Sequence, residues 1–101
     1  MLRVFKYPIP FGDYFKLPLP NGAKVLTVDV QYGQPTLWAL VNPNHKTKDR
    51  LFRFAGNGHD IEESLSRLEF VASFQMQNGL MFHVFEVNQT NQRRLHDNDP
   101  D

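Results

Sequence analysis

Short runs of alternating apolar and polar residues, each ended by proline, glycine or asparagine, recur along the chain and predict a mainly β fold. The clearest run covers residues 23–32, where Leu26 and Val28 lie on the same predicted face. Residues 36–41 are almost continuously apolar, which is typical of a central strand covered on both faces. The turn residues at 33–35 predict that these two strands form an antiparallel hairpin.

The remaining strands follow from the same alternation. We predict them at residues 2–7, 14–19, 50–55, 70–76 and 80–87. Pro18 restricts its run to an edge strand or an irregular extended segment, because proline has no N–H to donate to a second neighbour. Asn78-Gly79 separates the last two runs and is the strongest hairpin signal in the chain.

In two of these strands, the alternation also predicts which side chains share a face. Alternation with the residues between them predicts that one face of the run at 70–76 is shared by Phe70, Ala72, Phe74 and Met76. In the strand at 50–55, Phe52 faces one way and Arg53 the other.

A single short helix is predicted near residues 60–67. Asp60 is a suitable N-cap, and Ile61, Leu65 and Leu68 have the spacing of one helix face. Glu62 and Glu63 would then lie in the first turn, where negative charge is favoured by the helix dipole.

These elements give a mainly β (α+β) fold class: an antiparallel sheet forming a small barrel or sandwich of five to seven strands. Residues 1–87 are predicted to form one compact domain, and the polar residues 88–101 a disordered tail. One short helix cannot cover so many strands that are apolar on both faces. Either the sheet closes on itself or one face is buried in a homo-oligomer.

Charge and composition exclude several classes of protein. The 101 residues contain 11 basic and 11 acidic side chains, so the chain lacks the overall positive charge that dominates nucleic-acid binding. It contains no cysteine, which excludes disulfides and thiolate metal sites. We find no apolar run long enough to cross a bilayer and no secretory signal, so we expect a cytoplasmic protein.

No group of residues has the spacing of a catalytic or metal site. The four histidines do not share a helical or strand spacing, so we predict no metal and no cofactor. We therefore expect a non-enzymatic protein. If it were an enzyme, His59, His83 and Glu86 would be the first residues to substitute.

Two segments are candidates for binding a small anion. Glycines beside a helix N-terminus can offer backbone N–H groups to phosphate, although Asp60 would oppose this. A basic cluster with an aromatic neighbour could also follow a nucleotide backbone. The candidate ligand-binding residues are Gly56, Asn57, Gly58, His59, Lys46, Lys48, Arg50 and Arg53.

An exposed sheet face is the candidate for binding a protein. Trp38 is the only tryptophan, and its place in the most apolar strand predicts a core residue. If it faced solvent instead, it would be an interface anchor. His83 and Phe85 share a face of the last strand. We therefore predict an interaction surface that includes Trp38, His83 and Phe85.

The chain resembles small uncharacterised proteins encoded by bacteriophages and prophages. The stretches that carry this resemblance are VFKYPIP at 4–10, GQPTLWALV at 33–41, GNGH at 56–59 and FHVFE at 82–86. The resemblance brings no catalytic residues and implies only a phage setting. By analogy with that setting, we expect an accessory protein that binds and modulates a host protein in the host cytoplasm.

Two other functions remain open. The glycine loop (residues 56–59) could bind or sequester a nucleotide-like signal together with the basic cluster (Lys46, Lys48, Arg50 and Arg53), either within one chain or across an oligomer interface. Binding of single-stranded nucleic acid is the third hypothesis, and the neutral net charge disfavours it.

Overall fold

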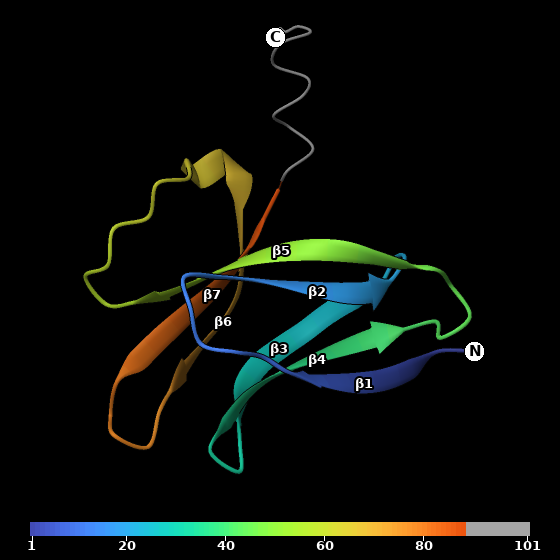
Figure 1. Ribbon diagram of the computed structural model, residues 1–101, viewed down its shortest axis with the longest axis horizontal. Helices are drawn as coiled ribbons and strands as arrows, with labels where there is room; N and C mark the ends of the chain where they lie inside the picture. Colours follow the sequence, from blue (N-terminus) through green and yellow to red (C-terminus); the bar gives the residue numbers. More distant parts are fainter. Residues whose placement is uncertain (89–101) are drawn as a thin grey trace, which may run out of the picture.

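The computed structural model describes residues 1–88 and contains seven strands and one short 3-10 helix (Figure 1). The alternating runs become strands because side chains on successive residues point to opposite faces, so one face of each can enter a core. In chain order the elements are β1 (Arg3–Pro8), β2 (Tyr14–Pro20), β3 (Lys24–Gln31), β4 (Gln34–Val41), β5 (Thr47–Gly56), η1 (Leu65–Arg67), β6 (Leu68–Gln75) and β7 (Met81–Val87).

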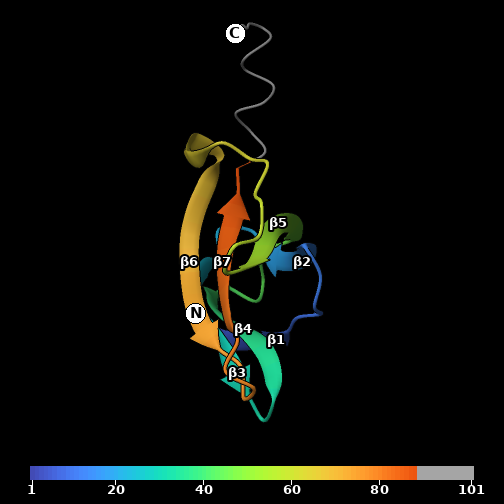
Figure 2. The ribbon, with the colours of Figure 1, turned by 90° about the vertical axis from the view of Figure 1, so that its left-hand side faces the viewer.

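The strands form two antiparallel sheets that pack as a sandwich (Figures 1 and 2). Sheet A has the order β1-β4-β3, and sheet B has the order β2-β5-β7-β6. The edge strands β3 and β6 contact each other without pairing. This open corner makes the fold a sandwich and not a closed barrel, and the predicted mainly β class is confirmed.

The core lies between the sheets and draws side chains from both. Phe54 is at its centre, and its ring lies 5.2 to 6.2 Å from the rings of four other phenylalanines. These four are Phe11, Phe15, Phe74 and Phe82. Sheet A contributes the fully buried Leu37 and Val41.

Both predicted hairpins are present. β3 and β4 are joined by the two-residue loop Tyr32-Gly33, in which both residues have positive φ (50° and 77°), as a type I′ turn requires. The turn therefore precedes the predicted position at 33–35, because Gln34 already pairs with Gln31. β6 and β7 are joined by a longer loop, since Gln75 pairs with Met81.

β2 is an edge strand, one of the two placements that Pro18 allowed. The Phe54 N–H donates to the Asp13 carbonyl at one end of the β2–β5 pair, and the Asn21 N–H donates to the Lys46 carbonyl at the other. In an antiparallel ladder, residue pairs that exchange two backbone hydrogen bonds alternate with pairs that exchange none. Pro18 and Pro20 therefore fall at positions that face solvent, where their missing N–H groups cost no ladder bond.

Two β-bulges place Phe70 and Leu26 on the face opposite to the predicted one. The register shifts between Phe70 and Ala72, so Val71 is an extra residue. Ala72 and Phe74 are buried, but Phe70 lies on the opposite face and is 61% exposed. A second bulge between Val25 and Thr27 likewise leaves Leu26 outside the core.

The helix predicted at 60–67 is wrong except for the 3-10 turn at Leu65–Arg67. Ser64, and not Asp60, is the residue that precedes this turn, and its side chain makes no cap hydrogen bond. A helix of two turns is too short to be stable without favourable packing. Here the Asp60 carbonyl, which the first turn of a helix would use, accepts a hydrogen bond from Arg53 instead.

β4 is central, as predicted, but it is not covered on both faces. Leu37, Ala39 and Val41 point into the core, whereas Trp38 and Leu40 are half-buried on the outer face of sheet A. Of the predicted tail at 88–101, only Asn88 is described, and its N–H donates to the Arg67 carbonyl. Residues 89–101 lie outside the described part of the chain.

The central position of Phe54 leads to a stability prediction. We expect Phe54→Ala to lower the free energy of unfolding by about 3–5 kcal/mol, because it removes a buried ring and leaves a cavity. Urea unfolding of the full chain measures this change. As a control, Tyr32→Ala should change the free energy by no more than about 0.5 kcal/mol, because Tyr32 is 97% exposed. Equal effects of the two substitutions would contradict the proposed core.

Candidate functional site

The predicted interaction surface divides between the two outer faces of the sandwich. Trp38 lies on the outer face of sheet A, because its neighbours Leu37 and Ala39 enter the core. His83 and Phe85 lie on the outer face of sheet B, because Val84 between them is buried. The structure therefore brings His83 and Phe85 together but places Trp38 on the opposite side of the molecule.

The outer face of sheet A has an apolar centre with basic residues beside it. Across the sheet, Leu40 lies between Val4 and Lys24, and Trp38 lies between Lys6 and Thr27. Val4 is 57% exposed. The Lys6 ammonium donates to the Gln31 side chain at 2.8 Å and so connects β1 to β3 over the central strand. We call Val4, Trp38 and Leu40 the Trp38 face.

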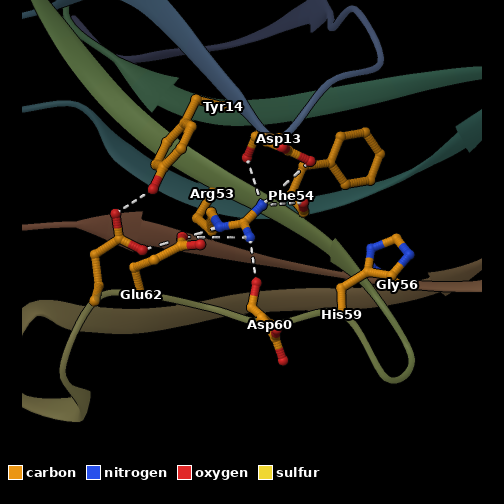
Figure 3. Close-up of polar contacts among 9 residues, drawn as sticks. Asp13, Tyr14, Arg53, Phe54, Gly56, His59, Asp60 and Glu62 are labelled. Carbon is orange, nitrogen blue, oxygen red and sulfur yellow. Dashed lines mark hydrogen bonds and ion pairs between the residues drawn. The ribbon is translucent and has the colours of Figure 1, made fainter.

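The outer face of sheet B is organised around a buried arginine (Figure 3). Arg53 is 3% exposed, and its guanidinium donates to the backbone carbonyls of Asp13, Phe54 and Asp60 at 3.1, 3.0 and 2.7 Å. It also lies over the Tyr14 ring, with 5.1 Å from the guanidinium carbon to the ring centroid. The segment 57–64 is thereby fastened to β5 and to the start of β2.

Glu63 supplies charge compensation for Arg53. One of its carboxylate oxygens is 3.9 Å from the Arg53 Nε, and the other accepts a hydrogen bond from the Tyr14 hydroxyl. This hydrogen bond lowers the pKa of the Glu63 carboxyl and raises the pKa of the Tyr14 hydroxyl. The local sequence pattern predicts Glu63 in the first turn of a helix and predicts no site role for Tyr14. Neither residue has a local sequence signal for this role, since they are far apart along the chain.

The glycine loop is held by two histidines. The His59 Nδ1 accepts a hydrogen bond from the Gly56 N–H, and its ring packs so close to Gly56 that an added Cβ would lie 3.1 Å from it. His83 bonds Ser73 through Nδ1 and Asn57 through Nε2, each at 2.7 Å. Because the Asn57 amide oxygen can only accept, the neutral His83 ring carries its proton on Nε2. The Gly56 N–H is therefore already bonded within the chain and is not offered to an anion.

The basic cluster is not brought together. Arg50 points to the same side of β5 as Phe52, whereas Arg53 is buried on the other side. The glycine loop follows the far end of β5, about 25 Å from Lys48 at the usual rise of an extended strand. Lys46 and Lys48 are exposed. The candidate ligand residues therefore do not form one site within a single chain.

Arg50 lies in a cleft at the open corner between β3 and β6. It donates to both carboxylate oxygens of Glu86, at 2.7 and 2.8 Å, and to the Ala23 carbonyl. The hydrogen bonds to Glu86 raise the pKa of the Arg50 guanidinium. Two adjoining cavities of about 350 Å³ each share Arg50, Glu69 and Glu86. Sequence reasoning missed Glu69, which becomes a cleft residue only because it pairs with Glu86 across the sheet.

Within residues 1–88, no three His, Asp or Glu side chains gather as a metal site would require. In the same part of the chain, no helix has the length and apolar character needed to span a membrane.

The fold and its two outer faces define a seven-stranded antiparallel β-sandwich protein. Over residues 1–95 the chain matches the model of DUF7352, a domain of unknown function, and it belongs to that family. Comparisons with curated proteins and with solved structures found no match. The family description says nothing of a phage origin, so the phage setting stays a prediction.

The contacts of Glu63 lead to a pH-dependent prediction. Its pKa in the folded chain lies below the ordinary value of 4.5, so its contribution to stability is present above pH 4.5 and is lost as the pH falls through the folded-state pKa. We expect Glu63→Gln to lower the free energy of unfolding by about 1–2 kcal/mol at neutral pH. The difference from the native chain should shrink at acid pH, as measured by urea unfolding across a pH series.

Glu62→Gln is the matched control for this series. The Glu62 side chain is 76% exposed and lies 4.0 Å from Arg53, so its substitution should cost less than about 1 kcal/mol at every pH. A Glu63→Gln difference that did not change with pH would contradict a role for the charge.

Proposed function

We propose that this protein is a non-enzymatic binding protein that contacts another protein through the Trp38 face. The observation that supports this proposal is an apolar sheet surface with no described element lying over it, formed by Val4, Trp38 and Leu40. Tryptophan is strongly enriched among the residues that dominate binding energy at protein interfaces. The lysines beside it, Lys6 and Lys24, suit a partner with acidic residues around an apolar centre.

The Trp38 face is a better candidate than the outer face of sheet B. On sheet B, the segment 57–64 is already fastened at Arg53, and Phe70 is the one strongly exposed phenylalanine of the described β6 and β7. Phe70 contacts Phe85, with their ring centroids 5.9 Å apart. A partner on sheet B would therefore meet Phe70 and Phe85 beside polar groups that are already bonded within the chain.

A small anionic ligand is less well supported. Lys48 and Arg50 line the cleft at the open corner, but Glu69 and Glu86 line it too. Two of the Arg50 donors are already bonded to Glu86. An anion entering this cleft would meet two carboxylates, so the electrostatics favour the protein-binding proposal over a nucleotide-like ligand or a nucleic acid.

The resemblance to phage and prophage proteins adds a finer proposal. The partner would be a protein of a bacterial host, met in the host cytoplasm and modulated or inhibited by this chain. Family membership neither supports nor opposes this part of the proposal.

The test is to substitute Trp38 and measure binding. The tagged full chain is used to capture a partner from bacterial lysate, and that partner is then purified and titrated against the chain. Because Trp38 is the only tryptophan, a partner that lacks tryptophan lets its fluorescence report contact at this face directly. We expect Trp38→Ala to weaken binding by about 30-fold or more, the loss typical of an interface hot spot.

Phe70→Ala is the matched control, because it removes an exposed aromatic ring from the opposite face. It should leave the affinity unchanged, and both variants are checked for native unfolding curves. Equal binding by Trp38→Ala and the native chain would show that the Trp38 face is not the interface. Failure to capture any partner would count against the proposal as a whole.

A further inference from the structure

β1 is an edge strand with one side unpaired. In the described chain it pairs only with β4, and Figure 1 shows it at the border of the molecule. The Ile9 N–H donates to the Pro35 carbonyl at 3.0 Å, which extends the β1–β4 register by one residue. Because bonded and non-bonded pairs alternate, the backbone groups of Phe5 and Tyr7 point toward β4. Those of Val4 and Lys6 point away from it.

The other sheet edges of residues 1–88 are interrupted by prolines or bulges along their length, whereas the β1–β4 register is regular from Arg3 to Pro8. On β2, Pro18 and Pro20 occupy the positions that face solvent. β3 and β6 face each other, and each contains a bulge. Prolines and bulges are common means of preventing an edge from pairing with another strand. On β1, the outward-facing proline is Pro8, at the end of the strand.

At and just before β1, the outer face carries two exposed apolar side chains, Leu2 and Val4, followed by the exposed Lys6. Leu2 and Val4 are 60% and 57% exposed and lie on the same face. The strand also contains two basic residues, Arg3 and Lys6, and no acidic residue. Any self-pairing must therefore keep the basic residues from lying directly opposite one another, because like charges in that position are destabilising.

We propose that β1 pairs in antiparallel fashion with β1 of a second copy of this chain, with Val4 opposite Val4 on a two-fold axis. This register places Arg3 opposite Phe5 and Lys6 opposite Leu2, so no like charges face each other. It uses the outward groups of Leu2, Val4 and Lys6 for about six backbone hydrogen bonds, two for each bonded pair. A register centred on Phe5 would place Leu2 opposite Pro8, so each of its two outermost pairs would form one bond and not two, because proline has no N–H to donate.

The pairing would join two copies of sheet A into one continuous sheet of six strands. The two Trp38 faces would then lie on the same side of that sheet. This inference goes beyond the proposed function and does not depend on it, since the paired groups are backbone atoms at the edge and not the side chains of Trp38 or Leu40.

Solution mass and amide exchange together test the pairing. Light scattering on the full chain should give twice the chain mass at high concentration. In the dimer, the Val4 and Lys6 amide hydrogens should exchange slowly. Dilution to the monomer should make both exchange faster. The Phe5 and Tyr7 amides should exchange slowly at every concentration, because they bond to β4. A chain that is monomeric throughout, or a dimer in which Val4 and Lys6 exchange freely, would overturn the proposal.

Val4→Pro provides a second test. It removes an outward N–H without removing a bond to β4, and proline is tolerated at such edge positions. We expect loss of the dimer with an unchanged circular dichroism spectrum, whereas Val4→Thr, which keeps the N–H and the branched shape, should remain dimeric. A folded Val4→Pro dimer would contradict the proposal. If this variant does not fold, the exchange pattern of the native chain decides the question.

Discussion

The burial of the Arg53 charge is the constraint on which the outer face of sheet B depends. A guanidinium that is only 3% exposed must be hydrogen-bonded, because an unpaired buried charge is very costly. The planar guanidinium donates hydrogen bonds to carbonyls on the turn before β2, on β5 itself and on the segment after β5. One side chain thus fixes three segments relative to one another. Lysine, with a single ammonium, could not serve carbonyls so widely spread in direction.

The sequence predicted the strands well because alternation and turn chemistry are local signals. The edge position of β2 and the two hairpins also followed from single residues and short turns. The facing of Phe70 and Leu26 could not be predicted, because each depends on a bulge one residue away that shifts the register. The helix at 60–67 failed for a different reason: the Asp60 carbonyl that a helix would use is bonded to Arg53, which is distant from any local pattern.

The candidate site residues likewise could not be grouped correctly from local sequence patterns. Proximity along the chain suggested that Arg50 and Arg53 act together, but three residues along a strand place them on opposite faces. Their partners, Glu86 and Glu63, come from other parts of the chain and are set by the sheet order. Trp38 is separated from His83 and Phe85 for the same reason. Each outer face of the sandwich therefore has its own chemistry.

The interleaved order of the strands has a kinetic consequence. The chain builds β1 into sheet A, β2 into sheet B, and then returns to sheet A for β3 and β4. Sheet A is complete within residues 3–41, whereas sheet B takes β2 from the first half of the chain and β6 and β7 from the second. β1 and β2 can pair only after β4 and β5 have been made, and such non-local pairings slow folding. During synthesis β1 must therefore wait for β4, and β2 for β5.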